Sequence, residues 1–194
     1  MTESIILGDR FFAALRYATH LHAGQVRKST NIAYISHPIG VASLVIEGGG
    51  DEEQAIGGLL HDIAEDCGGE IRLREIEDNF GARVEAIVRG CSDSLVQDSA
   101  QKAPWRERKL AHIAKISDAS DDIMLVSLAD KTHNARAIAT DYQLCGEEVW
   151  SRFNSSGDDI RWYYQSMYQV LEKRAQSKFL LTALDSAIKS FRAG

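Results

Sequence analysis

Two histidines and two aspartates, widely separated in the sequence, could together bind one divalent transition-metal ion. They are His37, the adjacent pair His61 and Asp62, and the distant Asp130. Imidazole and carboxylate ligands in this mixture suit Mn²⁺, Fe²⁺ or Zn²⁺ rather than metals that prefer thiolates. Four protein ligands on a six-coordinate ion would leave room for water and a substrate oxygen, which is typical of a catalytic site. Taken alone, His37 before Pro38 also fits a helix cap or a buried core histidine.

Two further acids, Glu65 and Asp66, follow His61 and Asp62 within the segment GGLLHDIAED. In a continuous helix with roughly 100° between residues, setting His61 at zero places Glu65 at roughly 40°, Asp62 at roughly 100° and Asp66 at roughly 140°. The four polar side chains would share one side of the helix, and the leucines would face the core. The pattern fits either a catalytic acidic face or a solvated acidic face that contains a histidine by chance.

Asp130 is predicted to border the hydrophobic core. In a helix through the segment SLADKTHNAR, it lies beside an arc of apolar residues. Because an unpaired buried carboxylate is very costly, Asp130 must either bind a metal or pair with a cation. The nearby cations are Lys131 and Arg136, although both are expected to point elsewhere around the helix. Asn134, one turn beyond Asp130, could donate to a ligand oxygen or satisfy buried backbone.

The elements that position these residues are predicted to be helices. Apolar residues recur at steps of three and four along nearly the whole chain, for example at Ala55, Leu59 and Ile63, and this spacing is helical. Only residues 32–36 offer a short stretch compatible with a strand. The chain has two prolines, so the commonest helix breaker is scarce. We therefore expect an all-α bundle.

Capping residues set the expected boundaries of the helices that carry the histidines. Pro38 should open one helix, which ends at the glycines 48–50. Asp51 and Gln54 form a capping-box pattern at the start of the next helix. That helix should continue without a break to Gly68, and it would carry the acidic segment.

The second half of the chain contains three further boundaries. A polar, aperiodic segment at 92–104 predicts a loop. Asp121 or Asp122 is expected to cap the helix that carries the SLADKTHNAR segment. Two final helices are expected at 160–175 and 177–192.

The composition is that of an ordinary globular protein, and we expect a single domain over residues 1–194. Lys and Arg number 22 and Asp and Glu number 28, which gives a net charge of −6. This balance disfavours general binding of nucleic acid, so an anionic ligand needs a local basic cluster. No secretory signal or membrane-spanning stretch is evident. Three cysteines without CxxC spacing fit reduced thiols in a cytoplasmic protein. The sequence does not indicate an oligomeric state.

Five ordered blocks of the sequence resemble the HD metal-dependent phosphohydrolases. They are Arg27-Lys28, YISHPI around His37, LLHDIAED, NFG with Val84, and LADKTHNAR. The H…HD…D signature alone is weak. The ordered set is similar to the hydrolase domain of the RelA/SpoT alarmone enzymes and to their single-domain relatives, the metazoan SpoT homologues and small alarmone hydrolases. The similarity covers roughly residues 11–171.

This resemblance implies an HD-domain helical bundle with the metal site in the bundle core. It also implies a Mn²⁺-dependent enzyme that removes the 3′-pyrophosphate of (p)ppGpp and gives GDP or GTP, with Fe²⁺ and Zn²⁺ as alternative ions. The positions that match the family's metal ligands are His37, His61, Asp62 and Asp130. Those that match the acidic pair beside the nucleophilic water are Glu65 and Asp66. Those that match residues in contact with the nucleotide are Arg27, Lys28 and Asn134.

Departures from the family pattern affect the substrate more than the metal. The loop Ser29–Ala33 has five residues where the family usually has four, and Ala137 stands where a threonine or similar residue is common. Two alternatives therefore stay open. One is an HD phosphohydrolase acting on another phosphorylated nucleotide, for example on the 2′-phosphate of NADPH. The other is a catalytically silent module that binds a nucleotide. Arg27 and Lys28 also fit a solvated turn, and the basic residues at 106–109 are interpreted as surface residues rather than pocket residues.

Overall fold

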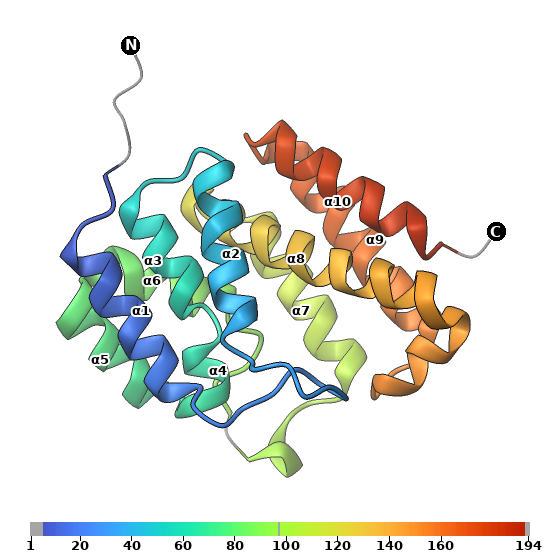
Figure 1. The fold of residues 1–194 in the computed structure, drawn as a ribbon, viewed down its shortest axis with the longest axis horizontal. Coiled ribbons are helices and arrows are strands. Elements are labelled where there is room, and N and C mark those ends of the chain that lie inside the picture. The colour runs from blue at the N-terminus through green and yellow to red at the C-terminus, as the bar shows by residue number, and fades with distance from the viewer. Residues whose placement is uncertain (1–5, 97, 193–194) are drawn as a thin grey trace.

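The computed structural model describes residues 6–96 and 98–192, which form a bundle of helices (Figure 1). Over these ranges the only β-pairing is an isolated antiparallel bridge between Val26 and Ala33, so the all-α prediction is confirmed. The α-helices are α1 (Asp9–Leu21), α2 (Ser36–Glu47), α3 (Glu52–Leu60), α4 (Ile63–Cys67), α5 (Glu70–Phe80), α6 (Ala82–Cys91), α7 (Trp105–Ser117), α8 (Asp121–Cys145), α9 (Gly157–Arg174) and α10 (Lys178–Ser190). Short 3-10 helices lie at Ser99–Gln101 and Gly146–Arg152.

Helix α8 runs through the middle of the bundle (Figure 1). It packs against α2, α3 and α6 on one side and against α9 and α10 on the other. Its N-cap is Ser120, whose hydroxyl accepts a hydrogen bond from the Ile123 N–H at 3.4 Å. The prediction that Asp121 or Asp122 caps this helix is therefore wrong. Both acids lie in the first turn, where negative charge favours the helix dipole.

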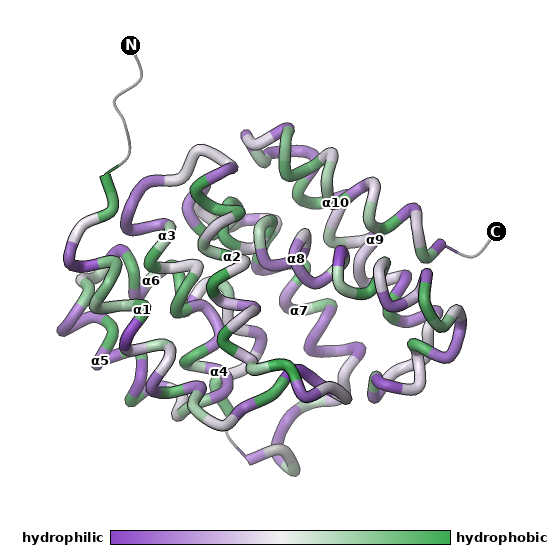
Figure 2. Tube along the Cα trace, viewed as in Figure 1, coloured by the Kyte–Doolittle hydropathy of each residue, from purple (hydrophilic) through white to green (hydrophobic). Residues whose placement is uncertain are grey.

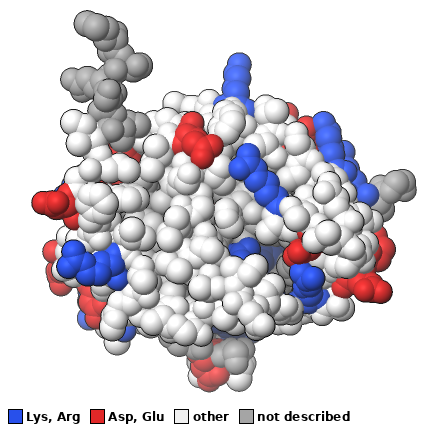
Figure 3. Space-filling model, viewed as in Figure 1, with Lys and Arg blue, Asp and Glu red and all other residues white. Residues whose placement is uncertain are grey.

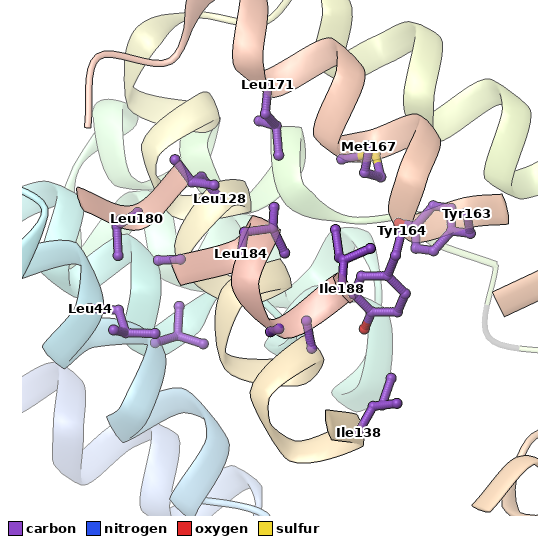
Figure 4. Packing of buried hydrophobic residues seen from close by; sticks show 14 of the residues in the cluster. Leu44, Leu128, Ile138, Tyr163, Tyr164, Met167, Leu171, Leu180, Leu184 and Ile188 are labelled. Atoms are coloured by element: carbon purple, nitrogen blue, oxygen red, sulfur yellow. The ribbon is translucent and has the colours of Figure 1, made fainter. Parts of the chain in front are cut away.

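The larger hydrophobic cluster joins α8 to α2, α9 and α10. The two final helices were predicted within three residues of their observed ends. Their apolar stripes face one another and face α8 (Figure 4). Along the helices hydrophobic and hydrophilic residues alternate, as amphipathic packing requires (Figure 2). Members of the larger cluster include Val41, Leu44, Leu128, Ala135, Met167, Leu171, Leu180, Leu184 and Ile188.

The smaller hydrophobic cluster joins α1, α3, α5 and α6. The capping box predicted for α3 is present, because Asp51 accepts from the Gln54 N–H at 2.9 Å and Gln54 accepts from the Asp51 N–H at 2.8 Å. Helix α2 contributes to both clusters, so the two cores meet between α2, α3 and α8. Members of the smaller cluster include Ala14, Ala42, Ile56, Leu59, Leu60, Ile63, Leu73, Ile76, Val84 and Val88.

The helix predicted to continue from Asp51 to Gly68 is interrupted at His61 and Asp62. Helix α3 ends at Leu60 and α4 begins at Ile63. The His61 Nδ1–H donates to the Gly58 carbonyl at 2.8 Å. In a continuous helix that carbonyl would accept from the Asp62 N–H instead. The His61 side chain thus replaces the backbone donor to the Gly58 carbonyl, and the chain turns at His61 and Asp62.

Helix α2 begins at Ser36, so Pro38 is the third residue of this helix and not the first as predicted. The described part of the 92–104 segment is a loop with one 3-10 turn. None of the described helices combines the length and apolar composition needed to span a bilayer. The three cysteines are free. On the face shown in Figure 3, basic and acidic side chains are scattered among one another without a broad basic patch.

Candidate active site

The two histidines and two aspartates predicted as metal ligands converge at the junction of the two hydrophobic clusters. His37 lies in the first turn of α2, His61 and Asp62 form the turn between α3 and α4, and Asp130 lies midway along α8. His37 Nε2 is 3.2 Å from Asp130 Oδ1 and 3.4 Å from Asp62 Oδ2. His61 Nε2 is 3.0 Å from Asp62 Oδ2 and 3.8 Å from Asp130 Oδ1. Ligands about 2.1 Å from one ion lie about 3 Å apart when they are at right angles around it.

The imidazole of His61 is oriented for metal binding. A carbonyl can only accept, so the Nδ1 atom facing Gly58 carries a proton, and Nε2 is the ring atom left to bind a metal ion. This Nε2 is buried and has no hydrogen-bond partner among the described residues, although Asp62 Oδ2 lies 3.0 Å away. An uncompensated buried nitrogen beside two carboxylates fits a shared cation at this point.

The imidazole of His37 is held by a second histidine. His133, on α8, places Nδ1 3.0 Å from His37 Nδ1. The His133 ring lies directly against Gly40 of α2, where a Cβ atom would be 2.3 Å away. Glycine at this position therefore allows the histidine pair to form. Such outer partners fix the orientation of metal-binding imidazoles.

The two aspartates each have a close side-chain partner beside the histidines. The Tyr34 hydroxyl donates to Asp62 Oδ2 at 2.5 Å. Lys131 Nζ lies 2.6 Å from Asp130 Oδ2, so the expectation that this lysine points elsewhere is wrong. Burial opposes ionisation of Asp130, but Lys131 and the nearby histidines hold the pKa of its carboxyl well below the usual range. A long side chain can fold back toward its neighbour in the helix, which a projection from Cα positions does not capture.

Glu65 and Asp66 lie in the first turn of α4 and line a pocket that His37, Asp62 and Asp130 also line. Glu65 Oε2 accepts from the Asp93 N–H at 2.9 Å. Burial, followed by the charges of Asp62 and Asp93, raises the pKa of Glu65. Burial and the charges of Asp62 and Glu65 raise the pKa of Asp66 to about 7, and water at its exposed side moderates this shift. Carboxyl groups with raised pKa values suit proton transfer near neutral pH.

Helix α7 contributes a basic wall to this pocket, whose volume is about 230 Å³. The Asp93 carboxylate accepts from Lys109 Nζ at 3.0 Å and also from Arg108. The surface interpretation of residues 106–109 is therefore wrong for Lys109, which lines the pocket, while Arg106 is exposed. His112, one turn later, is buried with Nδ1 unpartnered among the described residues. Burial and the Lys131 charge lower its pKa to about 3, so it is neutral. Lys109 and His112 are three residues apart, which is helical spacing, and this was the signal in the sequence that could have placed both on one helix face.

A second cavity of about 550 Å³ adjoins this pocket. The two share Arg27, Tyr34 and Asn134 in their walls. Arg27 Nη2 donates to Asn134 Oδ1 at 2.9 Å, and Asn134 Nδ2 donates to Asp130 Oδ1 at 2.6 Å. Lys28 lines the second cavity and donates to Asn154 at 3.0 Å. The structure thus brings the three predicted nucleotide contacts into one wall.

The five-residue loop Ser29–Ala33 forms one edge of the second cavity. The Arg27 N–H donates to the Ile32 carbonyl at 2.8 Å, which closes the loop. Ser29 takes the left-handed conformation with φ of 58°. Thr30 and Ile32 line the cavity. The loop therefore shapes the space available to a ligand, and none of its residues lines the pocket of about 230 Å³.

Comparisons with known proteins give a family match over much of the chain. A family model described as "HD domain" matches residues 14–155. Guanosine-3′,5′-bis(diphosphate) 3′-pyrophosphohydrolase MESH1 of Mus musculus is 32% identical over 82% of this chain and 81% of its own length. The MESH1 protein of Xenopus tropicalis is 35% identical over 82% of this chain and 81% of its own length.

Larger bacterial relatives match over a small part of their length. The bifunctional (p)ppGpp synthase/hydrolase SpoT of Escherichia coli is 32% identical over 68% of this chain, which spans 18% of that protein. A Synechocystis relative is matched over 16% of its length. Among solved structures, one described as a metazoan ortholog of SpoT that hydrolyzes ppGpp has a TM-score of 0.74 at 24% identity, over 96% of this chain and 97% of that one. This likeness confirms the fold.

Proposed function

The chain belongs to the HD domain family, and from this premise we propose that it hydrolyses guanosine tetra- and pentaphosphate alarmones. The reaction would release the 3′-pyrophosphate and give GDP or GTP. The observation that carries the proposal is the convergence of two histidines and two aspartates, whose Nε2 and Oδ atoms lie 3.0 to 3.8 Å apart, beside an acidic pair and a cavity of nucleoside size. The curated relatives of similar length bear the name of this activity.

We propose His37, His61, Asp62 and Asp130 as the metal ligands and Mn²⁺ as the ion, with Fe²⁺ and Zn²⁺ as the alternatives to be compared. Imidazole with carboxylate is a donor set that all three ions accept. A divalent ion supplies positive charge at a phosphoryl oxygen and makes a nearby water a stronger acid. Lys131 and Tyr34 hold the two carboxylates in place from outside the ligand set.

Glu65 and Asp66 are proposed to orient the attacking water and take its proton. Both line the pocket that His37, Asp62 and Asp130 also line, and both have raised pKa values. The Asp93 N–H donates to one oxygen of Glu65, so this carboxylate is held in place at the pocket wall. Asp66, on the exposed side, is suited to exchange the proton with solvent.

Arg27, Lys28 and Asn134 are proposed to bind the nucleotide. Arg27 and Asn134 lie where the two cavities join, which is the place where the ribose would meet its reacting 3′-pyrophosphate. An arginine offers forked donors to two oxygens at once.

Replacing Arg27 with alanine should raise KM for the nucleotide about tenfold and leave metal content unchanged. An unaltered KM would mean that the basic pair is only a solvated turn.

The proposed activity is tested with purified protein, Mn²⁺ and a panel of nucleotides. Pyrophosphate release from ppGpp is expected, with little phosphate release from NADPH. Hydrolysis of NADPH or another nucleotide without turnover of ppGpp would contradict the proposed substrate. Tight binding of ppGpp without hydrolysis at saturating Mn²⁺ would instead identify a silent binding module. Elemental analysis of the same preparation identifies the ion.

The domain and its cellular setting are part of the same proposal. We propose that residues 1–194 act as one HD phosphohydrolase domain, since α2 and α8 contribute to a core shared by the elements before and after them. We also propose a cytoplasmic protein with a small-molecule substrate and no nucleic-acid or membrane partner. The net charge of −6 and three free thiols support this setting.

A further inference from the structure

The second cavity ends in an ion pair that the proposed catalytic steps do not use. Asp141, near the end of α8, and Arg152, at the end of the 3-10 helix Gly146–Arg152, both line this cavity. Arg152 Nη1 donates to Asp141 Oδ2 at 2.6 Å. Both side chains are half-buried. The pair therefore lies within reach of a ligand that fills the cavity.

The position of the pair along α8 relates it to the phosphate end of the site. Asn134, Ala137, Ile138 and Asp141 recur at helical spacing and all line the second cavity. At about 1.5 Å per residue, Asp141 lies about 16 Å along the helix axis from Asp130. A nucleotide whose phosphate is at Asp130 and whose sugar passes Asn134 would thus place its base near Asp141.

The rest of the cavity wall suits a flat, mostly apolar group. Ile32, Ile138, Phe153 and Tyr164 contribute to it. Aromatic side chains provide surfaces on which bases stack. Among the described residues, the Asp141 carboxylate accepts one hydrogen bond, from Arg152. Since a carboxylate offers about four lone-pair directions and a guanidinium five N–H donors, both groups keep hydrogen-bonding capacity for a ligand.

We infer that Asp141 and Arg152 recognise guanine and discriminate against adenine, an inference that rests on the proposed nucleotide hydrolase function. Guanine presents two adjacent donors, N1–H and the 2-amino group, which match a carboxylate, and its O6 accepts from a guanidinium. Adenine presents an acceptor at N1, which a carboxylate repels. The pairing cancels the net charge of Arg152, so the pair offers hydrogen bonds to a neutral base rather than charge to a phosphate chain.

The test compares three nucleotides that differ only in the base. Wild-type protein and Asp141→Asn are assayed with Mn²⁺ and ppGpp, its inosine counterpart, which lacks the 2-amino group, and its adenosine counterpart. An asparagine amide presents a donor where the carboxylate presented an acceptor. The ratio of kcat/KM for guanine over adenine should fall at least tenfold, and the preference of guanine over inosine should disappear. The matched control is Asp185→Asn, which alters a helical ion pair with Lys189 on α10 and should leave both ratios unchanged.

Binding measurements separate this inference from the proposed activity. Dissociation constants of GDP, IDP and ADP report base recognition without turnover, and the same fall in selectivity is expected in Asp141→Asn. Release of pyrophosphate with unchanged base ratios would overturn only the role of the pair. No pyrophosphate release from any nucleotide would overturn the proposed activity, while the dissociation constants still decide base recognition. If removing the 5′-phosphates of the substrate abolished the effect of the variant, the pair would contact the phosphate chain and the inference would be wrong.

Discussion

Replacing Lys131 with methionine should destabilise the metal-free protein. The Lys131 ammonium is 2.6 Å from Asp130 Oδ2, and the two side chains are 13% and 11% exposed. Removing one partner of a buried ion pair costs about 3 to 5 kcal/mol, because the other charge is left uncompensated. His37 and His61 still face Asp130, so the lower end, about 3 kcal/mol, applies. For a chain of this size about 2 to 4 °C accompanies each kcal/mol, which gives a fall in Tm of about 6 to 12 °C.

The same substitution should enlarge the stabilisation provided by a divalent ion. An ion beside Asp130 supplies the positive charge that Lys131 has lost, so Mn²⁺ should raise the Tm of the variant more than that of the wild type. Thermal unfolding is followed by circular dichroism, first with a chelator and then with saturating Mn²⁺. Lys189→Met is the matched control, since its ammonium pairs with Asp185 on an exposed helix face. It should change Tm by no more than about 2 °C.

Three results would contradict this reasoning about Lys131. An equally small fall in Tm for both lysine variants would show that the ammonium does not compensate a buried charge. An unchanged response to Mn²⁺ would show that no cation binds beside Asp130. Loss of fold in the variant at all Mn²⁺ concentrations would assign the lysine a purely structural role.

Three further predictions concern the ligands and the acidic pair. Asp62→Ala should lose bound metal and nearly all activity, whereas Glu65→Gln should keep metal and lose at least a hundredfold in kcat; equal metal loss by elemental analysis would contradict the assigned roles. The pKa of Asp66 is raised to about 7, so its proton-accepting form is lost as the pH falls through that value. The kcat/KM should therefore fall below about pH 7, and Asp66→Asn should remove this pH dependence. Gly40→Ala would place a methyl group 2.3 Å from the His133 ring and should weaken Mn²⁺ binding about 10- to 100-fold in titrations; unchanged affinity would show that the histidine pair is dispensable.

Much of the fold follows from local patterns in the sequence. Helical spacing of apolar residues predicts α8, α9 and α10, and the capping box at Asp51 and Gln54 marks the start of α3. Helix caps act over a few residues, so they can be identified without knowledge of the tertiary structure. The interruption at His61 could not be predicted in this way, because it depends on a side chain replacing a backbone donor at the Gly58 carbonyl.

The convergence of the four proposed ligand side chains could be predicted from residue type and from the resemblance to a known family. The side chains that contact them could not be predicted in this way. Lys131 was misplaced because a helical projection gives the direction of the Cα–Cβ bond and not the path of a long side chain. Lys109 and His112 lie on a helix whose spacing places them on one face, but which element that face meets is decided by packing of α7 against α9, α6 and α8.

The meeting of the two hydrophobic clusters at α2, α3 and α8 has a mechanical consequence. Side chains from both halves of the molecule converge there. A bound ion would therefore connect two cores that could otherwise open separately. Partial opening of either half would then require release of the ion. Retention of metal would report the integrity of the whole bundle, and catalytic competence would be lost before global unfolding.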